Sequence, residues 1–371
     1  MILIVIDNLK IGGIQRLALD ECYYLKNKQV PFKLIVLDNP PKSENSMIEV
    51  DGDYFSKNGF DIKFLGKNNV VQILLLYKLI KSLDKNLTVV AHTVAGSLKL
   101  RITGLLLMRR VRILLWIHQF IFLSDRAQAN KRIWYSLSAS KLLFGAKQFQ
   151  VEWENYVNNK PFLKRVYKKV THFSRIGIYL DRVLWHKHPS YKTVNSESNH
   201  ILYASRITDW KGINSFIKIQ EFMKDYSYTS MILTSEDSFS KLESILPTNS
   251  KTEIVYNKCP SYFRDVNNLV HLYPTNYGKS LIHNQSIGLN VLEFIALGIP
   301  SVISTDSFQT FPELQDSELL LTHDWHDLND IMLSIDKLLT IPINIRRKIA
   351  ISLQNVISIE SHMKDILNDK H

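Results

Sequence analysis

Residues 1–22 read MILIVIDNLKIGGIQRLALDEC and carry the pattern that indicates the fold class. The first six residues are all apolar, as expected of a strand that is buried on both faces of a parallel sheet. A polar turn with Gly12 and Gly13 follows, and apolar residues then recur at helical spacing from Ile14 to Cys22. The stretch therefore predicts a strand, a glycine turn and a helix in immediate succession.

The same unit repeats along the chain. Further apolar runs predict strands at 32–38, 61–66, 87–93, 111–119, 200–207, 230–235, 252–257, 269–274 and 300–305. Helical spacing between them predicts helices at 70–83, 98–108, 213–223, 239–246 and 291–297, and a helical run over 327–367 that breaks near Pro342. Alternation of this kind favours an α/β fold with doubly wound parallel sheets.

The length of 371 residues suggests two domains. A basic, helical and less regular stretch covers 125–188, and the polar stretch 191–200 resembles a linker. We therefore predict a Rossmann-like first domain over 1–190, a second over 191–350, and a C-terminal helix over 351–371 that can cross back to the first domain. Two such domains would face each other across a cleft, with ligands beyond the carboxyl ends of the strands.

The net charge of +11 is concentrated in one part of the chain. Residues 101–200 hold 18 Lys and Arg against 5 Asp and Glu, whereas residues 201–371 hold 15 against 20. This asymmetry indicates an anionic partner, which is nucleic acid, membrane lipid or a phosphorylated substrate; the alternative is a contribution to solubility alone.

Cysteine content and hydropathy exclude several classes of protein. The 2 cysteines rule out a disulfide scaffold and a cysteine-ligated zinc site, and they fit a reducing cytoplasm. The longest apolar run, 113–123, is too short to cross a bilayer, which takes roughly 20 residues. No secretory segment is predicted.

Two loops have the residues to bind an anion. IGGIQR (11–16) joins the first strand to the first helix, where glycines permit close approach of a backbone and a helix N-terminus favours negative charge. SRITDWKG (205–212) follows the first strand of the second domain, and its Arg206 and Lys211 could neutralise a diphosphate. The alternatives are an ordinary βα turn and a solvated loop.

A third segment, QSIGLNVLEFIALGIPSVIS (285–304), places Glu293 on an otherwise apolar helix that follows a turn at Gly288. A carboxylate in such surroundings needs a partner, because burying an unpaired charge is costly. The two hydroxyls of a ribose would serve, and a salt bridge to a basic residue is the alternative.

His92 and His118 end two strands of the first domain, at the edge where ligands are expected. A lone histidine is more often structural than catalytic. Two histidines at equivalent strand ends strengthen the functional interpretation.

Together these segments resemble the GT-B glycosyltransferases of family 4, which have two Rossmann-like domains and use nucleotide-sugar donors. The family's opening Gly-Gly turn is similar to Gly12, Gly13 and Arg16, and its G-R-x4-K-G motif is similar to 205–212, with Ser205 in place of glycine. The P-S-x-Y segment is similar to 274–277. The E-x7-E motif falls on Gln285 and Glu293, followed by A-x-G-x-P over 296–300.

The resemblance implies a retaining hexosyltransferase that moves a sugar from a nucleotide-sugar donor to a saccharide or lipid-linked saccharide, without a metal ion or other cofactor, in the biosynthesis of a bacterial surface polysaccharide such as lipopolysaccharide. It also implies site residues. Donor binding falls to Gly12, Gly13, Arg206, Lys211, Gln285, Gly288, Leu289 and Glu293, catalytic roles fall to His118, Arg206 and Lys211, and His92 is assigned to the acceptor.

Two departures from the family pattern leave alternatives open. Gln285 replaces a carboxylate with a neutral amide, and residues 278–284 resemble an insertion. The alternatives are a sugar-nucleotide epimerase of the same architecture and an inactive scaffold in glycan assembly. A further alternative, a nucleic-acid-binding protein, rests on the basic residues 101–200. No nucleic-acid-binding motif is present in the sequence, so we expect no nucleic-acid partner. The single match to a metal-binding D-x-D motif, Asp51-Gly52-Asp53, is interpreted as a surface turn.

Basic clusters in the first domain predict peripheral attachment to an anionic membrane, on the cytoplasmic face. One cluster is Arg109, Arg110 and Arg112, and the other is Lys164, Arg165, Lys168 and Lys169. Leu163, Val166 and Tyr167 are expected to add apolar surface beside the second cluster.

Overall fold

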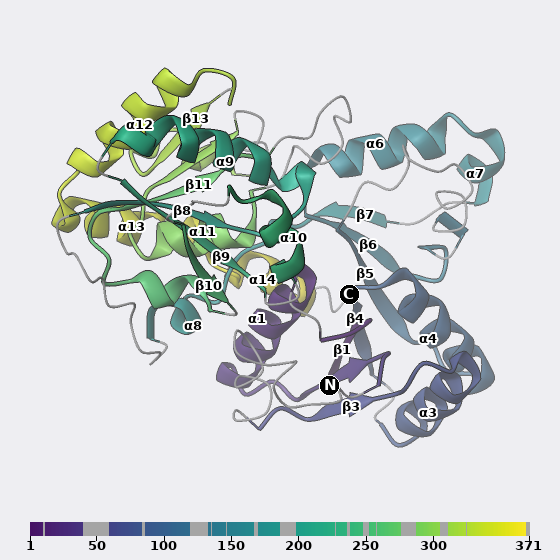
Figure 1. The fold of residues 1–371 in the computed structure, drawn as a ribbon. Coiled ribbons are helices and arrows are strands. Elements are labelled where there is room, and N and C mark those ends of the chain that lie inside the picture. Colours follow the sequence, from purple (N-terminus) through teal and green to yellow (C-terminus); the bar gives the residue numbers. More distant parts are fainter. Residues whose placement is uncertain are drawn as a thin grey trace. The chain divides into compact units, whose positions relative to one another are not determined.

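A computed structural model gives the fold (Figure 1). The structure describes residues 1–9, 12–39, 59–83, 86–118, 133–134, 136–145, 147–166, 170–185, 198–226, 228–235, 238–247, 252–256, 258–275, 287–304, 311–323 and 325–368. The chain forms two compact units. Unit 1 comprises Met1–Tyr179 and Ile359–His371, and unit 2 comprises Leu180–Ser358.

Unit 1 is built, over its described residues, on a seven-stranded parallel sheet in the order β3-β2-β1-β4-β5-β6-β7. The strands are β1 (Ile2–Ile6), β2 (Phe32–Val36), β3 (Ile62–Phe64), β4 (Thr88–Ala91), β5 (Arg112–Ile117), β6 (Lys141–Phe144) and β7 (Val170–Phe173). The helices are α1 (Gly13–Asn27), α3 (Asn69–Lys81), α4 (Val94–Leu106), α6 (Lys147–Asn158), α7 (Pro161–Val166) and α14 (Glu360–Asn368).

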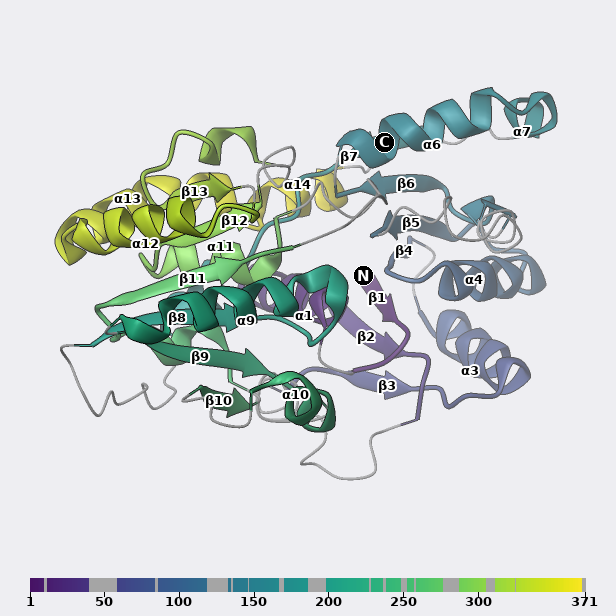
Figure 2. The same cartoon turned by 45° about the horizontal axis from the view of Figure 1, so that its top comes forward.

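Helices cover both faces of this sheet, which is why β1 is apolar throughout. Leu3 and Val5 pack in one core with residues of α3, α4 and α6. Ile2, Ile4 and Ile6 pack in the other core with residues of α1 and α14. Figures 1 and 2 show the helices on both sides of the strands. Because side chains alternate along a strand, both sets of residues must be apolar.

Unit 2 repeats this plan with a six-stranded parallel sheet in the order β10-β9-β8-β11-β12-β13 among its described residues. The strands are β8 (Asn199–Ala204), β9 (Tyr228–Thr234), β10 (Glu253–Tyr256), β11 (Leu269–Tyr273), β12 (Ser301–Ser304) and β13 (Leu320–His323). The α-helices are α8 (Leu180–Trp185), α9 (Ile213–Phe222), α10 (Phe239–Ile245), α11 (Leu289–Ala296), α12 (Leu328–Thr340) and α13 (Ile343–Ile357). Short 3-10 helices cover Asp209–Lys211, Met223–Asp225, Pro260–Phe263 and Pro312–Leu314.

The two units divide at different residues from those the sequence predicts. Unit 2 begins at Leu180, before the polar stretch 191–200, because α8 packs on unit 2 through Arg182 and the carbonyl oxygen of Leu184. The C-terminal boundary is also later than predicted: α13 belongs to unit 2, and the return to unit 1 begins at Ile359. The helical run does break near Pro342, and it breaks again before α14.

The prediction of a helical, irregular stretch over 125–188 is wrong in part, because β6 and β7 lie within it. Each strand has only four residues. β6 directly precedes α6, and β7 lies between α7 and α8, so periodicity does not separate these short runs from the helices beside them. These strands extend the sheet at the β5 edge.

His271, in the middle of β11, is fully buried against the ring of Phe294, with ring centroids 4.3 Å apart. Its Nδ1 lies 3.1 Å from the Ser301 hydroxyl on β12. Burial lowers the pKa of His271 from 6.5 to about 3. The folded state therefore holds a neutral imidazole at any pH near neutrality.

We predict that this histidine makes unit 2 less stable in mild acid. As the pH falls below 6.5, the unfolded chain binds a proton at His271 that the folded chain refuses until about pH 3. The free energy of unfolding should therefore decrease by about 1.4 kcal/mol per pH unit for this one group. Urea unfolding of the wild type and His271→Asn at several pH values measures the slope.

The His271→Asn variant should take up one proton fewer on unfolding in mild acid. Its free energy of unfolding should therefore fall less steeply with decreasing pH than that of the wild type, whatever its stability at neutral pH. His326→Gln removes an exposed histidine and is the control. Equal slopes in His271→Asn and the wild type would contradict the prediction.

Candidate functional site

The carboxyl ends of β8 and β11 lie side by side at the switch point of the sheet of unit 2. The strands that follow β8 continue to one side of it, and the strands that follow β11 continue to the other. Loops diverge at such a point, and open α/β sheets bind their ligands there. Arg206, Lys211, Gly288 and Leu289 all belong to these loops or to the helix that follows them.

Gly212 brings the two loops into direct contact. Its φ is +76°, and a Cβ at this position would lie 1.5 Å from the Pro274 carbonyl oxygen. Only glycine permits both this conformation and this approach. The last glycine of the motif over 205–212 therefore has a packing role: it lets the loop after β8 lie against the end of β11.

The Tyr273 hydroxyl connects Lys211 to the turn before α11. Lys211 Nζ donates a hydrogen bond of 2.5 Å to this hydroxyl and lies 4.9 Å from the centre of the ring. A Cβ on Gly288 would come within 2.8 Å of the same hydroxyl, so Gly288 has no room for a side chain. The lysine predicted to bind phosphate is thus held beside the glycine turn.

Helix α11 begins at this point without a side-chain cap. Gly288 is its N-cap, and no acidic residue lies in the first turn. The Asn290 side chain donates instead to the Ala204 carbonyl at the end of β8. The first N–H groups of a helix attract anions, and here they lie beside Gly288 and Lys211.

Arg206 is exposed, and its backbone is anchored by Tyr203, whose hydroxyl donates to the Arg206 carbonyl oxygen over 2.8 Å. Tyr203 is a buried residue of β8, so this hydrogen bond holds the loop backbone against the sheet. Sequence reasoning missed Tyr203, Tyr273 and Asn290, because nothing in their spacing shows that they join neighbouring loops.

Glu293 is fully buried and paired with Arg182 of α8. Arg182 Nη2 donates to Glu293 Oε1 over 2.6 Å, and the two side chains are 2% and 0% exposed. The structure therefore shows the salt bridge that the sequence left open as the alternative to a ribose contact. The ribose contact stays a prediction.

In unit 1, the switch point lies between β1 and β4. Gly12 is the N-cap of α1, in extended conformation and without a side-chain cap, and the space around a Cβ on Gly13 is open. His92 follows β4 and His118 follows β5. The predicted residues of unit 1 thus lie at one edge of its sheet.

His92 is buried, and both of its ring nitrogens have partners. Nε2 lies 2.8 Å from Glu21 Oε2 on α1, and Nδ1 lies 2.9 Å from His118 Nε2. This arrangement speaks against the predicted contact of His92 with an acceptor. Sequence reasoning missed Glu21, although it follows Leu17 by four residues and Ala18 by three, which is the helical spacing of the buried face of α1.

The membrane-contact predictions need two corrections. The Arg109 side chain donates to the carbonyl oxygens of Ile80 and Leu83 at 2.6 and 3.0 Å, so it caps the end of α3. Leu163 is a core residue of unit 1 and adds no surface. Lys164 and Arg165 on α7 are exposed, as is Arg110; Arg112 is half-buried.

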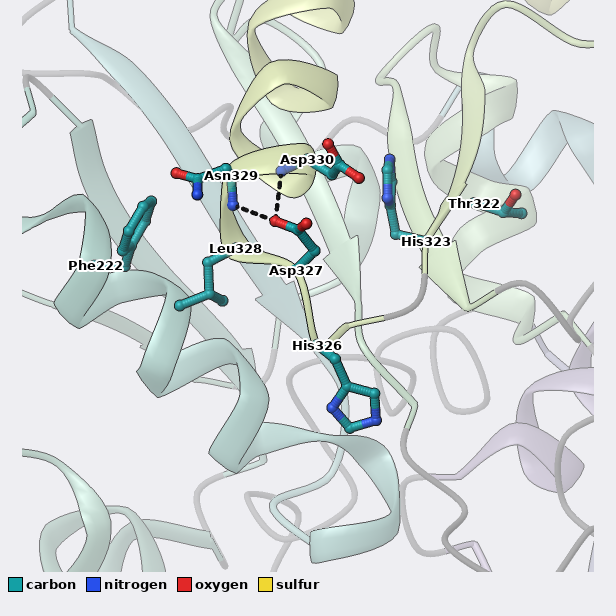
Figure 3. Close-up of a pocket in the computed structure, with 8 residues that line it drawn as sticks. All are labelled: Phe222, Thr322, His323, His326, Asp327, Leu328, Asn329 and Asp330. Atoms are coloured by element: carbon teal, nitrogen blue, oxygen red, sulfur yellow. Dashed lines mark hydrogen bonds between the residues drawn. The ribbon is translucent and has the colours of Figure 1, made fainter.

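One pocket of unit 2, of about 690 Å³, lies at the start of α12 (Figure 3). It is lined by Phe222, Thr322, His323, His326, Asp327, Leu328, Asn329 and Asp330. The Asp327 carboxylate accepts hydrogen bonds from the N–H groups of Asn329 and Asp330, so this helix N-terminus is already capped. No predicted site residue lines the pocket.

Several predicted residues lie outside the described ranges: Gln285, Tyr277, Tyr167, Lys168, Lys169 and the segment 51–53. Within the described ranges, no group of three or more His, Cys, Asp and Glu side chains is placed to hold a metal ion. In that same part of the chain, no helix is long and apolar enough to cross a membrane.

Comparison of the whole structure with solved structures decides the architecture. The chain is similar to Anabaena HepE in complex with UDP-glucose, with a TM-score of 0.67 and 12% identity, and to an alpha-glucosyltransferase in complex with UDP and a 13-mer DNA, with a TM-score of 0.68 and 14% identity; each match covers 99% of this chain and 98% of the other. The chain has the GT-B fold. A trehalose-6-phosphate synthase is also similar, with a TM-score of 0.65, 15% identity and the same coverage.

The GT-B architecture predicted from the sequence is thus confirmed. No protein-family model and no curated protein sequence matches the chain.

We predict that the buried pair Arg182–Glu293 supports the folding of unit 2. Glu293→Ala leaves the Arg182 guanidinium buried without its carboxylate, which should lower the free energy of unfolding by about 3–5 kcal/mol. The double variant Arg182→Leu/Glu293→Leu leaves no lone charge and should recover most of that loss. Urea unfolding measures all three proteins.

Asp61→Ala is the matched control, because it breaks the exposed pair with Lys33 and should cost less than about 1 kcal/mol. A Glu293→Ala variant as stable as the control would show that the pair does not support the fold.

Proposed function

We propose that the protein is a glycosyltransferase that takes a sugar from a nucleotide-sugar donor, with the diphosphate bound at the switch point of unit 2. The observation that carries the proposal is the convergence of Lys211, the exposed Arg206 and the uncapped start of α11 at the ends of β8 and β11. The known structures that are similar to the chain include complexes with UDP and UDP-glucose. A UDP-sugar is therefore the first donor to test.

Positive charge at this point suits departure of a nucleoside diphosphate. As the bond to the sugar breaks, negative charge grows on the diphosphate oxygens, and fixed cations and N–H groups stabilise that charge best. Lys211 would supply an ammonium group and α11 its first backbone N–H groups, near Gly288 and Leu289. With these groups the reaction would need no metal ion.

The remaining predicted residues keep the roles that the family resemblance implies. Glu293 and Gln285 would bind hydroxyls of the donor, and Gly12 and Gly13 of unit 1 stay predicted donor-binding residues. His118 would contact the donor sugar, as the family resemblance implies. The reaction would retain the anomeric configuration, with the acceptor hydroxyl attacking from the face that the diphosphate leaves and catalysis resting on position and electrostatics.

We predict that Lys211→Met and Arg206→Ala slow transfer more than they weaken binding of UDP. Loss of one such stabilising group typically costs about 100-fold or more in kcat. The assay is release of UDP from UDP-glucose, followed with and without a saccharide acceptor. The matched control is Lys218→Met, an exposed lysine on α9.

Other outcomes separate the alternatives. Epimerisation of the donor sugar would indicate a sugar-nucleotide epimerase, and donor binding without turnover would favour the scaffold. Full transfer by both variants would remove Lys211 and Arg206 from the mechanism.

We also propose that the acceptor is a saccharide or lipid-linked saccharide at an anionic membrane surface, in the synthesis of a surface polysaccharide. Two exposed apolar groups of unit 1 lie beside basic residues. Trp134 and Phe162 are 48% and 60% exposed, with rings 5.7 Å apart, next to Lys164 and Arg165. Leu105, Leu106 and Met108 are 70%, 61% and 97% exposed at the end of α4, next to Arg110.

Aromatic and basic side chains together are typical of peripheral attachment, with about 1 kcal/mol from each basic residue near the surface. We predict that the protein floats with anionic vesicles at low salt and is released as salt screens the charges. Lys164→Glu/Arg165→Glu and Phe162→Ser should each reduce flotation without changing UDP affinity.

Lys218→Glu/Lys224→Glu, on exposed lysines of unit 2, makes the same change in net charge and is the control. Retention on DNA in place of vesicles would favour a nucleic-acid acceptor, since one similar structure holds DNA.

A further inference from the structure

A buried chain of polar groups in unit 1 ends at His118. Glu21 Oε2 on α1 lies 2.8 Å from His92 Nε2, and His92 Nδ1 lies 2.9 Å from His118 Nε2. The side chains of Glu21 and His92 are fully buried, whereas His118 is only half-buried. The chain therefore runs from the interior of the unit to the residue that the proposed function assigns to the donor sugar.

The two imidazole rings meet edge to edge. Their centroids are 5.1 Å apart and their planes differ by 12°, while the facing nitrogens are separated by only 2.9 Å. Nearly coplanar rings with nitrogens this close have the geometry of an in-plane hydrogen bond. The ring of Trp116 lies nearly parallel to that of His118, with centroids 5.7 Å apart. The orientation of the His118 ring is thus set on its edge and on its face.

The charge of Glu21, at the buried end of these polar groups, decides the direction of the hydrogen bond with His92. Burial alone would raise the pKa of Glu21, but His92 and His362 outweigh it and lower this pKa to about 2. An ionised carboxylate only accepts hydrogen bonds, so His92 Nε2 must carry a hydrogen. Burial, followed by the neighbouring His92, lowers the pKa of His118 to about 3, so that ring is neutral.

Helix α14 encloses the inner end. His362 Nε2 lies 3.3 Å from Glu21 Oε1, and both side chains are fully buried. The rings of His362 and Trp116 meet edge to face at 5.5 Å. The carboxylate therefore has one histidine at each oxygen, and α14 contributes one of them.

We propose that Glu21 and His92 are positioning residues that set the tautomer of His118. With His92 neutral, its Nε2–H donates to Glu21, its Nδ1 accepts from His118 Nε2–H, and His118 Nδ1 is left as a hydrogen-bond acceptor; a charged His92 would donate from both nitrogens and reverse the tautomer of His118. A neutral acceptor nitrogen suits a sugar hydroxyl, which donates to it. The use of this nitrogen rests on the proposed function; the tautomer itself does not.

The first experiment reads the tautomer directly in the full-length protein. Selective ¹⁵N labelling of histidine with long-range ¹H–¹⁵N correlation distinguishes protonated from bare ring nitrogens, and His118→Gln assigns the signals. The expected result is a bare Nδ1 and a protonated Nε2 in His118. The opposite tautomer of His118 in the wild type would overturn the proposal.

The second experiment lets the hydrogen bonds that link residue 21, His92 and His118 run in either direction. In Glu21→Gln the side chain keeps its shape, but it can donate as well as accept, so the two tautomers of His118 should mix. Affinity for UDP-glucose should fall about tenfold, the value of roughly one hydrogen bond, while affinity for UDP stays the same. The control is Asp365→Asn, which alters a different contact of α14, with His172 at 3.2 Å.

The results separate the two claims. A wild-type protein that binds neither UDP nor UDP-glucose contradicts the proposed function, and the ¹⁵N spectrum still decides the tautomer. A wild type that binds both, with a Glu21→Gln variant of unchanged spectrum and unchanged UDP-glucose affinity, overturns the positioning role. His92→Asn repeats the test at the second residue if Glu21→Gln does not fold.

Discussion

Parallel pairing of the central strands is the constraint on which both candidate sites depend. β8 pairs with β11 in unit 2, and β1 pairs with β4 in unit 1. Parallel strands need long crossovers, so the loops that leave a central pair diverge and leave the strand ends accessible. Lys211 and Gly288 meet at one such edge, and Gly12 and His92 lie at the other. The apolar strands place these residues without taking part in the chemistry.

The charged pairs inside these apolar layers are tolerated because the partners neutralise each other. Arg182 and Glu293 neutralise each other within unit 2, and Glu21 is surrounded by His92 and His362 within unit 1. Charged groups in such surroundings are costly unless paired. His271 follows the other route and stays neutral. Stability and site geometry in this protein are therefore coupled to the ionisation of a few buried groups.

The C-terminal helix has a role in unit 1 beyond filling its core. Met363 and Ile366 of α14 pack with residues of α1 and β1, and His362 on the same helix reaches Glu21. Hydrophobic packing thus brings a titratable group to the inner end of the chain that leads to His118. In this way α14, near the C-terminal end of the sequence, becomes part of the surroundings of His118, a candidate functional residue.

The sequence by itself determined the α/β class, most strands and helices, the GT-B resemblance and the loops that hold Arg206, Lys211, Gly12 and Gly13. These features are local, because periodicity and glycine turns can be recognised from residues that lie close together in the sequence. The four-residue strands β6, β7 and β13 were missed: β6 and β7 lie beside helices, from which periodicity does not separate so short a run, and β13 was not recognised as a strand.

Only the tertiary structure decided which polar groups meet. Arg182 and Glu293 are 111 residues apart, and Glu21 and His92 are 71 apart. A charged residue in an apolar segment indicates that it needs a partner, but which residue is the partner depends on how the sheets and helices pack. For that reason Glu293 could be identified from the sequence as a buried carboxylate, while its pairing with Arg182, and the link from Glu21 to His118, could not.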